Sequence, residues 1–186
     1  MSEKKLLQGA LAGATVILAL SGCTSTSPSS TDTRVSSSAS AAARPSPTSS
    51  CGPSSGEEVA AKPIRALALP SGLSDARWDA AHADYSGYEP CAALSWSVVT
   101  IEGSTPSSPY AILLFHDGEY LGTATSVPYG FSPVIARGSD DAISVTYRYA
   151  QGTDSNADPS GRATATYRWN AATGRVDMRG STPPDQ

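Results

Sequence analysis

The stretch Ala111-Ile-Leu-Leu-Phe-His-Asp-Gly-Glu-Tyr-Leu-Gly-Thr-Ala-Thr125 carries the clearest structural signal in this chain of 186 residues. An apolar run leads into Asp117-Gly118, and a second run of strand-forming residues follows. Asp-Gly between two such runs is typical of a β-hairpin, because a type I′ turn requires positive φ at both of its central positions. We therefore predict a hairpin over residues 111–125.

A period of two continues on both sides of this hairpin. Residues 143–149 and 163–169 alternate between apolar side chains and Ser, Thr or Arg, and shorter strand candidates lie at 94–101 and 175–179. Alternation of this kind indicates an antiparallel sheet with one face in solvent. The fold class predicted is α+β, with a mainly antiparallel meander of five to six strands packed on one side.

Short helices are expected before the strands. Ser55 and Glu58 fit a capping box, and Pro63 is expected to limit the helix that follows. A second helix is predicted from Ser74, with one face formed by Trp78, Ala81 and His82.

The N-terminus reads as a secretory leader. Lys4 and Lys5 precede the uncharged residues 6–20, which at 1.5 Å each span only ~23 Å of a ~30 Å hydrocarbon core. Leu20-Ser21-Gly22-Cys23 then places a thiol behind two small residues and resembles a bacterial lipobox. We expect residues 1–22 to be a signal peptide and Cys23 to carry acyl chains such as palmitate, which hold a protein on a membrane. An uncleaved anchor and ordinary secretion remain alternatives.

The rest of the chain divides by composition. Residues 24–50 are mostly Ser, Thr, Ala and Pro, and they offer too little apolar surface to offset the entropy of ordering. We predict that 23–50 form the lipidated N-terminus and a disordered tether, that 51–180 form one globular domain, and that 181–186 form a disordered tail.

The net charge and the number of cysteines limit the classes of function that the protein can have. The formal net charge of −4, without a basic cluster, argues against nucleic-acid binding. Once Cys23 carries lipid, Cys51 and Cys91 remain as a pair, and a disulfide closing that loop would contribute about 4 kcal/mol. Two independent free thiols are the alternative. No metal motif or redox CxxC appears, so no cofactor is expected.

Three ordered segments carry a family resemblance. They are Tyr88-Glu-Pro-Cys-Ala-Ala-Leu-Ser-Trp96, Phe115-His-Asp-Gly-Glu-Tyr-Leu-Gly-Thr-Ala-Thr125 and Pro159-Ser-Gly161. They resemble landmarks of the LppP/LprE lipoprotein family, envelope proteins of high-GC Gram-positive bacteria, over about residues 78–169. The resemblance implies a membrane-attached envelope protein and implies no reaction.

His116 and Glu119 are the best candidates for catalysis. Across a two-residue turn they would face each other within hydrogen-bond reach, and a His paired with a carboxylate is a usable base. A cross-strand charge pair, or a role for His116 and Glu119 in binding a ligand at the edge of the sheet, explains the same residues without catalysis. No nucleophile elbow, HExxH helix or phosphate loop accompanies them, and His82 precedes Asp84 by a spacing that does not share a helix face. We therefore do not expect an enzyme.

Arg148 and Arg168 fall on the threonine side of their predicted strands. They would offer Arg forks to a carboxylate, phosphate or glycan, and a plain solvated face is the alternative. The aromatic residues on the opposite side are expected in the core rather than as a platform for sugars; they are Tyr147, Tyr149, Tyr167 and Trp169.

The sequence thus favours a lipid-anchored module on the extracytoplasmic face of the cell membrane, which binds or scaffolds an envelope ligand or protein partner. The alternative is a hydrolase-like envelope enzyme that uses His116 with Glu119.

Overall fold

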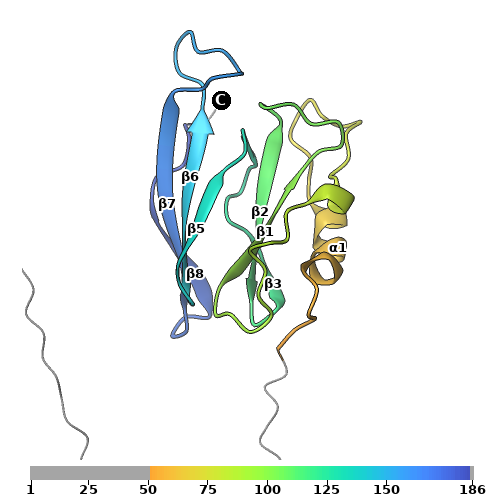
Figure 1. The fold of residues 1–186 in the computed structure, drawn as a ribbon, viewed down its shortest axis with the longest axis vertical. Coiled ribbons are helices and arrows are strands. Elements are labelled where there is room, and N and C mark those ends of the chain that lie inside the picture. The colour runs from red at the N-terminus through yellow and green to blue at the C-terminus, as the bar shows by residue number, and fades with distance from the viewer. Residues whose placement is uncertain (1–50, 185–186) are drawn as a thin grey trace, which may run out of the picture. The chain divides into compact units, whose positions relative to one another are not determined.

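The computed structural model describes residues 51–184 (Figure 1). The predicted signal peptide, the lipidation of Cys23, the tether and the last two residues lie outside this range. The helical elements are α1 (Gly56–Ala66) and the short 3₁₀ helix η1 (Ala80–His82). The strands are β1 (Ser95–Thr100), β2 (Pro109–His116), β3 (Glu119–Thr123), β4 (Tyr129–Gly130), β5 (Val134–Ser139), β6 (Ala142–Tyr149), β7 (Gly161–Asn170) and β8 (Arg175–Gly180).

The hairpin predicted from Asp117-Gly118 is confirmed. Strands β2 and β3 pair antiparallel, with His116 opposite Glu119. Asp117 has φ 46° and Gly118 has φ 76°, as a type I′ turn requires. Gly118 also packs against Gly52, where a Cβ would lie 2.5 Å from the Gly52 Cα. The glycine therefore serves both the turn and a close backbone approach.

The strands form two antiparallel sheets rather than one meander. One sheet has the order β1-β2-β3, with β4 paired to β2, and the other has the order β5-β6-β7-β8. The prediction of five to six strands is wrong, because residues 51–184 contain eight. The two missed strands are β4, which has only two residues, and β5, whose pattern is interrupted by Arg137 and Gly138.

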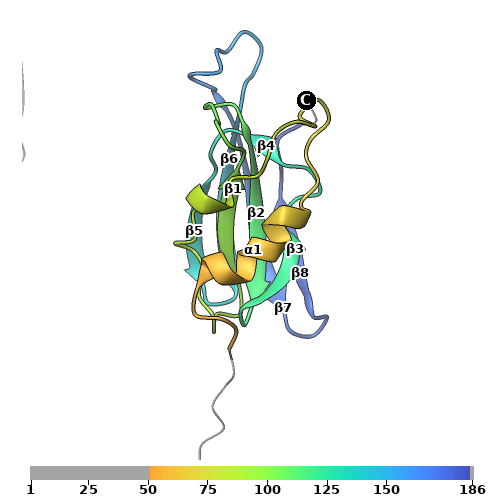
Figure 2. The same cartoon turned by 90° about the vertical axis from the view of Figure 1, so that its right-hand side faces the viewer.

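Strand β2 lies at the centre of the domain and is covered on both faces. Within it, the five consecutive residues from Ala111 to Phe115 are all buried. Ile112 and Leu114 join the core between the sheets, whereas Leu113 and Phe115 join the core beneath α1. Figures 1 and 2 show the result as three layers, with α1 on one face of β1-β2-β3 and the sheet β5–β8 on the other. The expectation of packing on one side only is corrected by this double burial.

The N-terminal helices differ from the prediction. The Ser55 side chain caps α1 by accepting from the Glu58 N–H at 3.4 Å, as the capping box predicted. Pro63 does not end the helix, which continues to Ala66 at the cost of the one hydrogen bond that Pro63 cannot donate. The predicted helix from Ser74 is wrong, because Trp78 instead makes an antiparallel bridge to Ile101.

Within residues 51–184, no helix is long and apolar enough to cross a membrane. After β8 the chain stays attached to the sheet, because the Ser181 N–H donates to the Thr164 carbonyl at 3.0 Å and Pro183 is buried.

Candidate functional site: a cationic sheet face

The outer face of the sheet β5-β6-β7-β8 points away from the rest of the domain (Figure 1). From Gly161 to Arg168 in β7, buried and exposed residues alternate, with Ala163 and Ala165 buried and Thr164 and Thr166 exposed. Tyr167 continues the buried row. This alternation places one row of β7 in the core and the other row in solvent.

Five arginines share this outer face. Residues directly opposite each other in an antiparallel pair project to the same side, so the register with β7 assigns the faces of β6 and β8. We call the surface the cationic face; its arginines are Arg148, Arg162, Arg168, Arg175 and Arg179. They are five of the nine Lys and Arg residues between 51 and 184, whereas that range contains fourteen Asp and Glu.

Few carboxylates neutralise the cationic face. Asp141 forms a salt bridge with Arg168, and Asp177 is the cross-strand partner of Arg168. Arg168 and the Ser139 hydroxyl hold the pKa of Asp141 below its usual range, with the Ser139 hydrogen bond as the larger cause. The other four arginines form no salt bridge with any residue between 51 and 184. A domain with an acidic total charge thus presents one basic surface.

Arg148 and Arg162 form a like-charge pair. They lie directly opposite each other in the β6–β7 ladder, an arrangement that destabilises a sheet. The Arg162 Nη1 donates to the carbonyls of Pro159 and Gly161, at 2.6 and 2.8 Å. The Arg148 Nε is buried and has no hydrogen-bond partner among the described residues. An anion bound between the two guanidinium groups would offset this repulsion.

Arg148 and Arg168 share a face as predicted, but they do not form one site. Arg148 pairs with Arg162 at one end of the β6–β7 ladder, and Arg168 pairs with Ala142 at the other. Six residues of strand separate these positions, which corresponds to ~20 Å. Between them lie the hydroxyl pairs Ser144–Thr166 and Thr146–Thr164. The face is therefore suited to an extended ligand rather than to one carboxylate.

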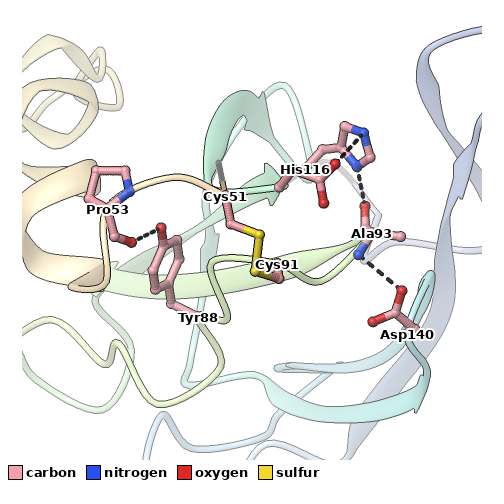
Figure 3. Close-up of a disulfide and its surroundings, with 8 residues drawn as sticks. Cys51, Pro53, Tyr88, Cys91, Ala93, His116 and Asp140 are labelled. Carbon is pink, nitrogen blue, oxygen red and sulfur yellow. Dashed lines mark hydrogen bonds and ion pairs between the residues drawn. A yellow bond between two sulfur atoms is a disulfide. The ribbon is translucent and has the colours of Figure 1, made fainter. Parts of the chain in front are cut away.

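His116 has other partners than Glu119. Its Nδ1 lies 2.8 Å from the Ala93 carbonyl, to which it donates, and its Nε2 lies 3.5 Å from an Asp117 carboxylate oxygen (Figure 3). The ring also stacks on Trp169. The predicted hydrogen bond to Glu119 is absent among the contacts of the described part, although the two residues are cross-strand neighbours. This geometry holds the histidine in place between the two sheets.

Cys51 and Cys91 form a disulfide, with Cα atoms 5.0 Å apart (Figure 3). The bridge fixes the start of the domain beside the β2–β3 hairpin, where the Gly52 N–H also donates to the Asp117 carbonyl at 2.9 Å. Tyr88 reinforces the junction by donating its hydroxyl to the Pro53 carbonyl at 2.6 Å. The pairing predicted from the cysteine count is the one that forms.

The aromatic residues opposite the arginines lie in or beside the core, as predicted. Tyr147 and Tyr167 are buried, and their hydroxyls bond each other at 2.7 Å. Burial raises the pKa of both phenols. Tyr149 and Trp169 are partly buried against the same core. Tyr147 and Tyr167 are therefore unavailable as an exposed platform for sugars.

The partner of His82 is Asp79, which sequence reasoning missed. The His82 Nδ1 lies 2.9 Å from an Asp79 carboxylate oxygen, at a spacing of three residues across η1. No group of three or more His, Cys, Asp or Glu side chains in the described range is arranged to hold a metal ion.

A comparison with known protein families supports the resemblance noted in the sequence. Residues 86–172 match the LppP/LprE lipoprotein family. This match confirms the resemblance carried by the Cys91 segment, the hairpin and Pro159-Ser160-Gly161. It spans β1 to β7 and therefore includes Arg148, Arg162 and Arg168 of the cationic face. Comparisons with curated proteins and with solved structures found no significant match.

Proposed function

We propose that this LppP/LprE lipoprotein is a lipid-anchored binding module that holds an anionic, extended ligand of the cell envelope on its cationic face. Cys23 is the lipidated residue in this proposal, and residues 24–50 carry the domain away from the outer surface of the membrane. The family match supports an envelope lipoprotein.

One observation carries the proposal. Five arginines gather on a single wet sheet face of an otherwise acidic domain, and two of them, Arg148 and Arg162, oppose each other and form no salt bridge with the residues between 51 and 184. Arg guanidinium groups recognise carboxylates and phosphates through paired hydrogen bonds. Because the arginines are spread along and across the strands, the ligand that fits is a polymer with repeated anionic groups.

The enzyme alternative receives less support. Of the two residues on which it depends, His116 is already occupied by the Ala93 carbonyl and the Trp169 ring. Glu119 is exposed and is not hydrogen-bonded to it. Binding therefore accounts for the arrangement of charges, and catalysis does not.

Cross-linking on whole cells tests the proposal. A photoreactive amino acid at Thr164, an exposed position at the centre of the cationic face, is compared with the same group at Lys62 on α1. We expect Thr164 to capture an anionic envelope polymer and Lys62 to capture none. Equal capture at both positions, or none at Thr164, would refute the assignment of the face.

The lipid anchor has a separate test. Metabolic labelling with a fatty-acid analogue is expected to mark the protein, and replacement of Cys23 by Ala is expected to abolish the label. Label retained by the Cys23→Ala protein would rule out this lipidation site while leaving the cationic face untouched.

A further inference from the structure

A second, chemically different cleft lies at the edge where β1 approaches β5. Its volume is about 180 Å³. Trp96, Val98 and Thr100 line it from the β1 face that looks toward the second sheet, and Ile135 lines it from β5. A cleft of this volume holds several water molecules and therefore has room for a small polar ligand such as a single sugar ring.

The polar lining offers hydroxyl and carboxylate groups. Asp84 and Ser86 come from the segment beside β1, and Tyr110 is the cross-strand partner of Thr100. None of the described residues that line the cleft is Lys or Arg. The nearby Arg137 is engaged elsewhere, since it donates to the carbonyls of Leu94 and Gly87 and forms a salt bridge with Glu89. The cleft is thus built for hydroxyl groups and not for anions.

Asp84 is fixed in place before any ligand arrives. Its backbone exchanges two hydrogen bonds with Val98, at 2.8 and 2.9 Å. One carboxylate oxygen accepts the Ser86 N–H at 2.9 Å. The other oxygen accepts no hydrogen bond from the described residues and remains available to a sugar hydroxyl. A fixed carboxylate beside hydroxyl groups gives orientation to a polar ligand.

His82 is oriented in the same manner. Because its Nδ1 donates to the Asp79 carboxylate, the neutral ring presents Nε2 as a hydrogen-bond acceptor. The His82 side chain is 84% exposed, so the acceptor is accessible at the mouth of the cleft.

Trp96 supplies a rigid apolar wall. Its ring lies against Gly87, where an added Cβ would come within 2.1 Å of the indole, and the Arg137 guanidinium sits 4.9 Å from the ring centroid. Both neighbours pack against the indole, which with Val98 and Ile135 completes an apolar wall. An apolar wall opposite polar groups matches a pyranose ring, which has C–H faces and a hydroxyl edge.

We propose that this cleft binds one neutral pyranose ring, with Asp84, Tyr110 and His82 contacting its hydroxyl groups and the apolar wall of Trp96, Val98 and Ile135 contacting its C–H face. The site is distinct from the cationic face and does not depend on it. Its negative charge disfavours acidic sugars, whereas the cationic face favours anions.

The three tryptophans of the chain provide the readout. Trp96 lines this cleft, Trp78 lines one of about 130 Å³, and Trp169 lines one of about 260 Å³. Their indole N–H signals in a ¹H–¹⁵N spectrum therefore report separately on three clefts. The ring signals of the two histidines provide a second readout, because His82 lies at the proposed site and His116 lies outside it.

In the experiment, the mature chain carries Cys23→Ser so that it is not lipidated. It is titrated with methyl glucoside, N-acetylglucosamine and glucuronate at millimolar concentrations. We expect saturable shifts of the Trp96 indole and the His82 ring with at least one neutral sugar, while Trp78, Trp169 and His116 stay unchanged. Glucuronate should bind more weakly. No shift with either neutral sugar, a shift confined to Trp78 or Trp169, or tighter binding of glucuronate overturns the proposal.

Two substitutions sharpen the test. Asp84→Asn keeps an oxygen for the Ser86 N–H, and Tyr110→Phe removes only one hydroxyl, so both proteins are expected to fold. Each should weaken sugar binding about fivefold to tenfold, the effect of one hydrogen bond. Thr164→Val on the cationic face is the matched control and should leave the affinity unchanged. Equal affinity in all three variants contradicts the proposed contacts.

Discussion

The imidazole of His116 lies almost parallel to the indole of Trp169, with ring centroids 3.9 Å apart and an interplanar angle of 20°. His116 belongs to β2 and Trp169 to β7, so the stack joins the two sheets. The Nδ1 bond to the Ala93 carbonyl fixes the ring in this position. His116, which the sequence made the best candidate for catalysis, therefore has a structural role and joins the two sheets.

Replacing His116 by Ala is expected to destabilise the domain by about 1–3 kcal/mol, because the stack and one hydrogen bond are lost. Denaturant unfolding measures the change. His82→Ala is the control, because the His82 side chain is 84% exposed, and it should shift stability by less than ~0.5 kcal/mol. Equal stability of the two variants would contradict the structural role of His116.

Removal of the disulfide by Cys51→Ser with Cys91→Ser is expected to lower the free energy of unfolding by up to about 4 kcal/mol, since the bridge closes a loop between residues 40 apart. Unfolding of the variant and of the native protein, with and without reductant, measures this difference. Mass analysis of unreduced peptides should show Cys51 joined to Cys91. Two free thiols in that analysis would disprove the pairing.

Gly87→Ala is expected to destabilise the domain by about 1–3 kcal/mol, because the new methyl group would collide with the Trp96 ring. Gly138→Ala is the matched control. There the nearest atom to an added Cβ is the Ala142 carbonyl oxygen, at an ordinary 3.6 Å. A Gly87→Ala protein as stable as the control would show that the indole does not rest on this glycine.

Asp154 makes stability depend on pH. One of its carboxylate oxygens accepts from the Ser160 N–H, the Gln151 N–H and the Ser160 hydroxyl, and these bonds, led by that of the Ser160 N–H, hold its pKa below the usual 3.8. The pKa of Asp154 is lower in the folded protein than in the unfolded chain. Its contribution to the free energy of unfolding is therefore complete above the unfolded pKa and is lost as the pH falls through the folded pKa. Stability measured from pH 5 to pH 2 should therefore fall less steeply in Asp154→Asn. Parallel curves for the two proteins would argue against this linkage.

Local chemistry made much of the fold predictable. Asp117-Gly118 predicted the hairpin because its turn requires positive φ at both positions, and Ser55 predicted the start of α1. The second sheet layer was not predictable from the sequence. The run of buried residues in β2 indicates that both of its faces are covered, but it does not indicate which elements cover them. The segment around Trp78 was misassigned because its pairing with Ile101 is a long-range contact.

The candidate site was predictable only in part. The alternation of Arg162, Thr164, Thr166 and Arg168 is visible in the sequence and places four polar residues on one face of β7. Arg175 and Arg179 join them only through the register of β8, which no local pattern fixes. The pairing of Arg148 with Arg162 likewise depends on the length of the loop between β6 and β7.

The most direct test of the cationic face is cosedimentation of the lipid-free mature chain with isolated, lipid-extracted cell walls over a range of salt concentrations. Arg148→Gln with Arg162→Gln is compared with Arg65→Gln with Arg77→Gln, which removes the same charge from exposed positions outside the face. We expect binding that weakens with salt, about tenfold weaker for the first pair and unchanged for the second. Equal binding by both variants, or binding that salt does not weaken, would contradict the account.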